Sequence, residues 1–213
     1  MKHFTKEKLD ELDKLARVNL INSISGYKPA NLIGTISAAK QTNLAIFSSV
    51  VHLGTNPPLF GFITRPTTEV PRHTYENIRE IGVYTISHVH ESFIEKAHYT
   101  SAKFDRETSE FAACGLTEEY LENFDAPFVR ESQIKLGLRF VEEIPIQLNG
   151  TILIIGKIEH LILPENILES DGNIDLNAAG EVCVSGLDGY HAVEKAVRFP
   201  FARPNNVPDF KQS

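Results

Sequence analysis

Residues 41–64 form the run QTNLAIFSSVVHLGTNPPLFGFIT, which decides the fold class. Residues 43–51 and 59–64 are rich in apolar and β-branched side chains and predict two strands, with a turn signal at Asn56-Pro57-Pro58 between them. A further strand is predicted just before this run, over residues 30–37. Connections this short do not allow parallel crossovers, so we expect the three strands to pair antiparallel.

The rest of the chain continues this pattern of short strands with inserted helices. Helices are predicted over 5–17 (amphipathic), 72–80 and 91–99, with helical turns near 107–113 and 117–122. Strands are predicted over 83–87, 134–148 and 151–163. Asn149-Gly150 lies between the last two and is a strong hairpin signal. The pattern predicts a mainly β protein: an antiparallel, Greek-key-like β-barrel with helical decorations.

Length and composition favour one principal domain. A chain of 213 residues, 42% of them hydrophobic, can bury a sizeable core. We expect a helical N-terminal extension over 1–25, the barrel domain over 26–198 and an extended tail over 199–213. Cys114 and Cys183 lie far apart in sequence, so a disulfide framework is not expected and both are predicted to be buried core residues.

The charge balance disfavours two classes of function. The chain has 21 Lys and Arg against 28 Asp and Glu, a formal net charge of -7, whereas nucleic-acid and membrane-surface binding both favour a basic face. The N-terminus is too charged for a signal peptide, and no apolar stretch approaches the roughly 18 residues of a membrane helix. We therefore expect a cytoplasmic protein with no nucleic-acid or membrane partner.

Polar residues near the ends of these elements suggest an anion site. Ser48 and Ser49 follow an apolar strand, Arg65 stands where the third strand ends, and Arg72 and Thr74 open a helix. Taken singly, each has an ordinary structural role as a strand end, a solvated cation or a helix cap. Together they offer guanidinium groups, hydroxyls and free helix N–H groups, which are the groups that a phosphate monoester requires.

Other ligand motifs are weaker or missing. No GxGxxG motif follows a strand and no GxxxxGK[ST] motif occurs, so the common nucleotide-binding loops are not expected. His88 and His90 could face one side of a strand as metal ligands, but no third ligand follows at a regular spacing. We interpret the two histidines as structural residues and predict no metal site.

The order of these segments resembles the flavin-reductase-like family of FMN-binding split β-barrels. The matching segments share the family's strand, turn and helix-start patterns, and they are Asn43–Ser48, Asn56–Leu59, Arg72-His73-Thr74 and Gly82–Ile86. A weaker likeness continues, so that most of residues 28–165 is covered. The chain departs from the family at Ile46-Phe47, where many members place a proline or a small residue before the serine.

The resemblance implies FMN as the cofactor. Asn43 and the backbone of Ala45, Ile46 and Phe47 would then lie along the isoalloxazine edge. Ser48 and Ser49 would reach the ribityl chain or the phosphate. The resemblance further implies that Arg72 and Thr74 bind the phosphate, with Arg65 as a second cation.

The resemblance also implies an assembly and a reaction. Members are usually homodimers with the flavin at the subunit interface, and the segments Thr100-Ser101-Ala102-Lys103 and Tyr190-His191 are candidates for the part of the pocket given by the other chain. The implied activity is an NAD(P)H-dependent flavin reductase that transfers hydride from nicotinamide to flavin, with an oxygenase as one redox partner. An electron-transfer flavoprotein of the same fold and a non-enzymatic ligand-binding barrel stay open as alternatives.

Overall fold

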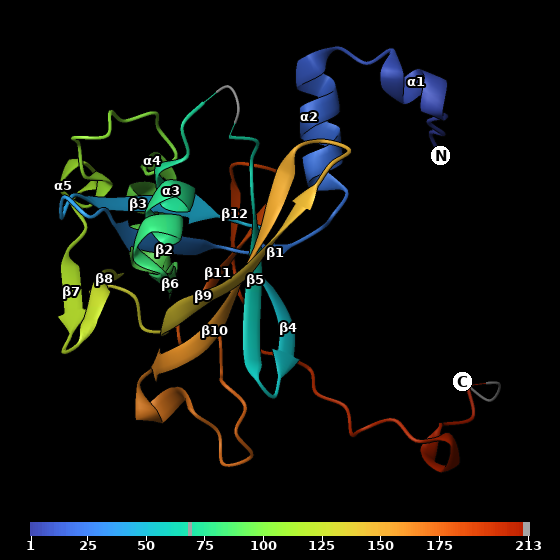
Figure 1. Ribbon diagram of the computed structural model, residues 1–213. Helices are drawn as coiled ribbons and strands as arrows, with labels where there is room; N and C mark the ends of the chain where they lie inside the picture. Colours follow the sequence, from blue (N-terminus) through green and yellow to red (C-terminus); the bar gives the residue numbers. More distant parts are fainter. Residues whose placement is uncertain (68–69, 211–213) are drawn as a thin grey trace.

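The computed structural model describes residues 1–67 and 70–210 (Figure 1). Its largest element is a seven-stranded sheet with the order β3-β2-β6-β9-β10-β5-β4, in which every neighbouring pair is antiparallel. The predicted mainly β, antiparallel fold is therefore confirmed. The strands are β2 (Asn31–Ile36), β3 (Thr42–Phe47), β4 (Val51–Thr55), β5 (Pro58–Thr64), β6 (Val83–His88), β9 (Lys135–Ile146) and β10 (Thr151–Ile162).

The sheet curls around an apolar core as a barrel, in which the end strands β3 and β4 do not pair with each other. Ile33, Phe62 and Tyr84 are fully buried in one cluster although they come from β2, β5 and β6. A Cβ on Gly156 would lie 2.2 Å from the Tyr84 hydroxyl, so only glycine leaves room there for the tyrosine ring. Strand twist and side-chain alternation thus place one face of the sheet inside the barrel.

The hairpin between β9 and β10 forms where it was predicted. The N–H groups of Asn149 and Gly150 both donate to the carbonyl of Ile146, at 3.3 and 2.9 Å. Gly150 adopts a φ of +72°, which glycine accepts at little cost. The Asn-Gly signal therefore located the turn correctly.

The strand predicted over 43–51 is interrupted. β3 ends at Phe47 and β4 starts at Val51. Between them the Ser49 hydroxyl donates to the carbonyl of Ile63 and accepts from the N–H of Ile63, both at 3.1 Å. This side chain pins the end of β3 to the backbone of β5, so the chain bends there and starts a new strand.

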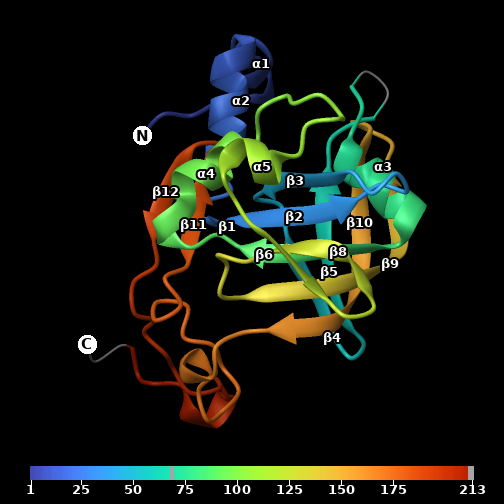
Figure 2. The same ribbon diagram turned by 90° about the vertical axis from the view of Figure 1, so that its left-hand side faces the viewer.

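Helices and short strands surround one side of the barrel (Figure 2). The prediction of a helical turn over 117–122 was wrong, because Glu118–Leu121 pairs with a neighbouring segment as a strand. Thr117, just before it, is held by the Glu131 carboxylate through both its N–H and its hydroxyl. The remaining elements are α3 (His73–Ile81), η1 (Glu91–Phe93), α4 (Ile94–Tyr99), α5 (Glu110–Cys114), β7 (Glu118–Leu121), β8 (Phe124–Val129) and η2 (Glu165–Ile167).

The N-terminal region differs from its prediction. Instead of one amphipathic helix over 5–17 there are two short helices, α1 (Lys6–Asp10) and α2 (Lys14–Ser23), which project from the barrel in Figures 1 and 2. Asp13 separates them, because its carboxylate accepts the N–H groups of Leu15 and Ala16 at 3.0 Å and so starts a new helix. Neither helix has a buried residue.

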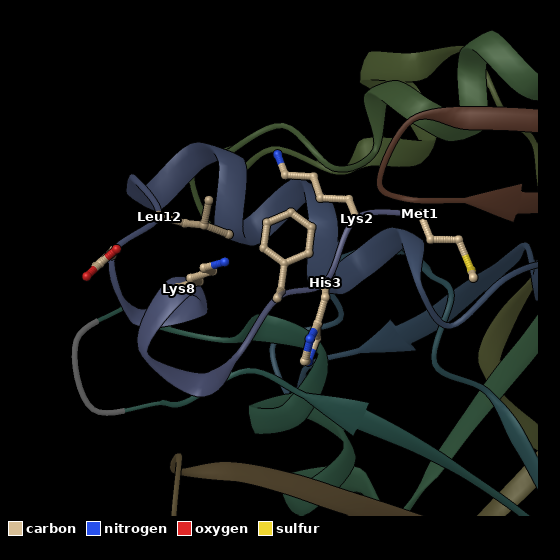
Figure 3. A pocket seen from close by; sticks show the side chains of 7 residues that line it. Met1, Lys2, His3, Lys8 and Leu12 are labelled. Carbon is tan, nitrogen blue, oxygen red and sulfur yellow. The ribbon is translucent and has the colours of Figure 1, made fainter.

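A shallow hollow near the N-terminus belongs to this extension alone. Figure 3 shows its lining side chains, which include Met1, Lys2 and Lys8. The Lys2 ammonium lies 4.8 Å from the centre of the Phe4 ring, an exposed cation–π contact. Since all of its lining residues lie within residues 1–12, this hollow is a feature of the extension and not of the barrel.

A small second sheet packs beside the barrel, and the chain then runs out as a tail. The strands β1 (Lys28–Pro29), β11 (Val182–Ser185) and β12 (Gly189–Ala192) form the sheet. From residue 199 to 210 the one regular element is η3 (Pro204–Asn206), and Phe199 and Phe201 are exposed. Residues 211–213 of the predicted tail lie outside the described residues, and the domain limits at 25 and 198 stay predictions.

The prediction that both cysteines are buried was wrong. Cys114 and Cys183 are free thiols of intermediate exposure, so neither belongs to the fully buried core. Cys114 is the last residue of α5, and Cys183 lies in β11, where buried and partly exposed residues alternate. Within the described residues, no helix is long and apolar enough to cross a membrane.

Candidate functional site

A pocket of about 640 Å³ opens between the end of β3, the start of α3 and the segment 100–106. These elements lie beside one another in Figures 1 and 2. All of the residues that the sequence pointed to as cofactor ligands line this pocket: Asn43, Ala45, Ile46, Phe47, Ser48, Ser49, Arg65, Arg72, Thr74, Ser101 and Lys103. Residues up to 60 positions apart in the sequence are therefore brought together.

The N-terminus of α3 faces the pocket with unpaired donors. Arg72 is the N-cap residue, and its side chain does not cap the helix. The backbone N–H groups of His73, Thr74 and Tyr75 have no acceptor within the residues that the structure describes. Such first-turn N–H groups, together with the positive end of the helix dipole, favour an anion.

Two guanidinium groups converge beside this helix end. Both arginines line the pocket, burial lowers the pKa of Arg72, and the positive charge of Arg65 lowers that pKa further. Arg72 is oriented by a hydrogen bond from its Nε to the carbonyl of Pro66 at 3.2 Å. In the described part of the chain neither arginine pairs with a carboxylate, and a bound anion would offset their positive charges.

A buried polar network positions Thr74. The amide Nδ2 of Asn43 donates to the hydroxyl of Thr74 at 3.0 Å and to the hydroxyl of Thr35 at 3.3 Å. Asn77 also donates to Thr35, at 3.1 Å. Since the Thr74 oxygen accepts from Asn43, its own proton is available to a ligand. The Asn43 side chain therefore points to the predicted phosphate end, while its backbone lies on β3.

The free edge of β3 forms the other end of the pocket. β3 is an edge strand that pairs only with β2, in a regular register. The N–H of Leu44 points away from β2, because it donates to the Glu110 carboxylate at 2.8 Å. Backbone groups alternate in direction along an antiparallel strand, so the N–H and C=O of Ile46 also point outward. In the described residues these two groups have no protein partner.

The two serines differ in what they can offer a ligand. Ser49 uses its hydroxyl as both donor and acceptor on the Ile63 backbone. Its predicted contact with a ribityl chain or phosphate would have to compete with these bonds. The Ser48 side chain makes no hydrogen bond within the described residues, so Ser48 is the better placed of the pair.

The segment 100–106 forms the third wall. It contributes Ser101 and Lys103 as predicted, but from the same chain as β3 and α3. Arg106, which the sequence did not suggest, bonds to Glu76 and lies 3.5 Å from the side-chain oxygen of Asn77. These contacts fasten the segment to α3 and bring another guanidinium to the pocket.

Tyr190 and His191, predicted to complete the pocket from the other chain, do not line the pocket of their own chain, and their role toward a second chain stays a prediction. The Tyr190 hydroxyl lies 3.1 Å from the His98 ring, and His191 bonds to Ser185 at 2.8 Å. Neither lines the pocket between β3 and α3. Both belong to β12, whose pairing with β11 fixes their direction.

Glu110 is the residue of the pocket that sequence reasoning missed most clearly. It is only 6% exposed and yet lines the pocket from the start of α5. Burial raises the pKa of its carboxyl group. The hydrogen bond from the N–H of Leu44 and the electrostatic effect of His73 lower this pKa and so offset part of the rise. In the sequence, Ser109-Glu110-Phe111 contributed to the weaker part of the family resemblance, but no function was predicted for Glu110.

The histidine pair lies away from the pocket. His88 bonds to the Glu181 carboxylate at 3.0 Å, and His90 accepts the N–H of Ser92 at 3.1 Å as the cap of η1. Across the described residues there is no group of three or more His, Cys, Asp or Glu side chains placed to hold a metal. Both histidines thus have structural partners.

The family model of the flavin reductase like domain matches residues 27–194. The chain belongs to this family. A curated relative, an uncharacterized protein of Halalkalibacterium halodurans, is 30% identical over 200 residues, which is 92% of this chain and 94% of the relative. The match covers the whole barrel, so the resemblance that the motifs gave is confirmed.

Solved structures agree with this assignment. A split-barrel protein of Shewanella frigidimarina, described as a candidate flavin reductase, is 50% identical, with a TM-score of 0.91 over 95% of this chain and all (100%) of that one. The flavoredoxin of Desulfovibrio vulgaris is 26% identical, with a TM-score of 0.72 over 83% of this chain and 92% of its own. Component B of nitrilotriacetate monooxygenase from Bacillus cereus shares the fold, at 19% identity and a TM-score of 0.82 over 93% of this chain and 98% of its own.

Proposed function

We propose that this chain is an FMN-binding flavoprotein that acts as an NAD(P)H-dependent flavin reductase. The observation that carries the proposal is the pocket, in which two like-charged arginines, an available hydroxyl and unpaired helix N–H groups meet opposite a free strand edge. Membership of the flavin reductase like family supports flavin as the ligand.

The phosphate would bind at the start of α3. Arg72 and Arg65 would supply charge-assisted hydrogen bonds, and Thr74 would donate its free hydroxyl proton. The first-turn N–H groups would complete the site. Lys103, on the segment 100–106, would add positive charge near the phosphate or near the anionic groups of a dinucleotide, whereas the charge of Arg106 is paired with Glu76.

The ring would bind along β3. The pyrimidine part of isoalloxazine carries an N–H between two carbonyls, and an outward N–H and C=O on one residue match such an edge. Ile46 offers that pair, while the side chains of Ile46 and Phe47 provide apolar surface. Phe47 is held by an edge-to-face contact with Phe62, with ring centres 5.0 Å apart.

The cofactor would supply hydride and single-electron chemistry, and the protein would bind and orient it. Arg65, Arg72 and Thr74 would fix one end of the flavin, and the β3 edge the other. The protein's further task is to leave one ring face open to a nicotinamide, and the segment 100–106 forms the wall nearest to such a ligand. We place the reaction in the cytoplasm, where NADH and NADPH are available.

We further propose a homodimer with the flavin at the subunit interface and an oxygenase as a redox partner. The likeness in fold to a monooxygenase component B supports the partner class. Exposed apolar residues on the sheet, such as Val51, Leu53 and Val141, offer a surface for a second copy. Sedimentation of the purified protein tests the dimer, and a mass of one chain would contradict it.

The purified protein itself tests the flavin proposal. It should be yellow, or become so after addition of FMN, with the absorbance of an oxidised flavin. Anaerobic mixing with NADH or NADPH should then bleach that absorbance. A colourless protein that also fails to bind added FMN would exclude the flavin function.

An electron-transfer flavoprotein is the second candidate. The 26% identity to a flavoredoxin favours it. The same anaerobic mixing separates the two candidates. If a reduced redox protein bleaches the flavin absorbance but NADH and NADPH do not, the result would indicate electron transfer instead of direct hydride acceptance.

A further inference from the structure

The free edge of β3 has three positions whose backbone groups point outward, at Thr42, Leu44 and Ile46, and their surroundings differ. The Thr42 hydroxyl lies 2.7 Å from both the Ser109 hydroxyl and the Glu118 carboxylate. The N–H of Leu44 donates to Glu110. The third position, Ile46, keeps its backbone groups free within the described residues and lines the pocket.

Glu110 is placed where it controls this edge. Its carboxylate oxygen Oε2 lies 2.8 Å from the Leu44 nitrogen, a normal distance for a charge-assisted hydrogen bond. The residue is nearly buried, so the contact is protected from competing water. It lines the pocket together with His73, the first residue of α3, while its carboxylate contacts β3.

We propose that Glu110 is a positioning residue that sets the register of the flavin ring on β3, by occupying the N–H of Leu44 and leaving the backbone of Ile46 for the ring. The inference rests on the proposed flavin function. It concerns a residue outside the proposed phosphate ligands Arg65, Arg72 and Thr74, so it adds a second determinant of flavin placement.

The length scale explains why register matters. Leu44 and Ile46 are two residues apart, which is about 6.6 Å along a strand. A rigid ring that moved by this distance toward Leu44 would pull the phosphate away from the start of α3. With Glu110 in place, the ring and phosphate contacts can be made together.

Amide NMR of the full-length protein tests the register directly. Protein labelled with ¹⁵N at leucine and isoleucine is titrated with FMN after removal of any bound flavin. In the wild type, the Ile46 amide signal should shift and the Leu44 signal should stay. In Glu110→Ala the Leu44 signal should shift as well, and the FMN dissociation constant should rise about threefold to tenfold.

Two further variants separate positioning from folding. Glu110→Gln keeps an acceptor oxygen for Leu44, so it should restore the wild-type pattern and an affinity within about twofold of the wild type. Ser109→Ala removes the neighbouring contact with Thr42 and should change neither signal. The control is matched because Ser109 contacts Thr42, which is the next outward residue of β3 beyond Leu44.

The outcomes distinguish this inference from the proposed function. If the wild type fails to bind FMN, the flavin function itself falls. If FMN binds and shifts Leu44 as strongly as Ile46 in the wild type, the proposed register is wrong. Equal affinity of Glu110→Ala and wild type, or a Glu110→Gln variant as weak as Glu110→Ala, would also overturn the positioning role.

Discussion

The two ends of the pocket are built from different chemical groups. At the α3 end, charged and hydroxyl side chains gather around unpaired helix N–H groups, with Arg65, Arg72 and Thr74 as the main members. At the β3 end, the available groups belong to the backbone of Ile46, while Glu110 occupies the N–H of Leu44. The proposed phosphate site thus depends on residue types, and the proposed ring site depends on which backbone groups the fold leaves unpaired.

The largest expected effect comes from removing both cations at the α3 end. Each charge-assisted bond is worth about 1.5–3 kcal/mol, so Arg72→Ala should raise the FMN dissociation constant roughly tenfold or more, and Arg65→Ala/Arg72→Ala roughly a hundredfold. Quenching of flavin fluorescence measures both. Riboflavin, which lacks the phosphate, should bind these variants as it binds the wild type.

Arg79→Ala is the matched control for these variants. Arg79 lies in the last turn of the same helix and pairs with Glu143 at 2.5 Å, away from the pocket. Its loss should leave the FMN affinity unchanged. A loss of riboflavin binding equal to that of FMN in the double variant would contradict a phosphate site at the start of α3.

Thr74→Ala should have a smaller effect at the same end. The variant loses a donor to the phosphate and leaves the Asn43 amide with one partner fewer. We expect a threefold to tenfold weaker FMN affinity and about 1 kcal/mol lower free energy of unfolding, measured by fluorescence titration and chemical denaturation. Thr74→Ser keeps the hydroxyl and should recover most of both. If Thr74→Ser binds FMN no more tightly than Thr74→Ala, the hydroxyl has no role in FMN binding.

Salt should separate the two ends without any mutation. Raising the ionic strength from about 0.05 to 0.5 M shortens the screening length several-fold, so FMN binding should weaken several-fold. Riboflavin binding, which depends on the β3 end, should change less than about twofold. If the binding of FMN and of riboflavin weakened equally with salt, the proposed electrostatic difference between the two ends would be wrong.

The smallest effect concerns the pH dependence of folding. Burial raises the pKa of Glu110 in the folded chain above its ordinary value, so the folded state holds this proton more tightly than the unfolded state does. Its contribution to stability is therefore complete below about pH 4.5 and is lost as the pH rises through the folded pKa. Glu110→Gln carries no such proton. The wild type should lose free energy of unfolding relative to this variant between pH 4.5 and pH 7, and a constant difference would contradict the shift.

The sequence predicted the fold where local signals and tertiary pairing agree. Asn149-Gly150 has turn chemistry that suits only a tight hairpin, and the strands beside it pair as expected. Residues 117–122 were predicted to form a helical turn, but pairing of Glu118–Leu121 with β8 outweighs this weak local preference. The break after Phe47 depends on a bond from Ser49 to Ile63, a contact 14 residues away that no periodicity reveals.

The candidate site divides in the same way. Arg65, Arg72 and Thr74 stand at element ends that the sequence marks, so their meeting could be predicted. Glu110 and Arg106 come from a loop-rich region whose path is set by packing against β3 and α3, and nothing local marks them. Charge patterns therefore predicted the α3 end, and the family resemblance pointed to β3, whereas the contacts of Glu110 and Arg106 required the structure.

A comparison of FMN and riboflavin binding by the deflavinated wild-type protein tests the central claim most directly. If the phosphate binds at the start of α3 and the ring on β3, FMN should bind at least about tenfold more tightly than riboflavin, while both show the same change in flavin absorbance. Equal dissociation constants for the two flavins would contradict the account.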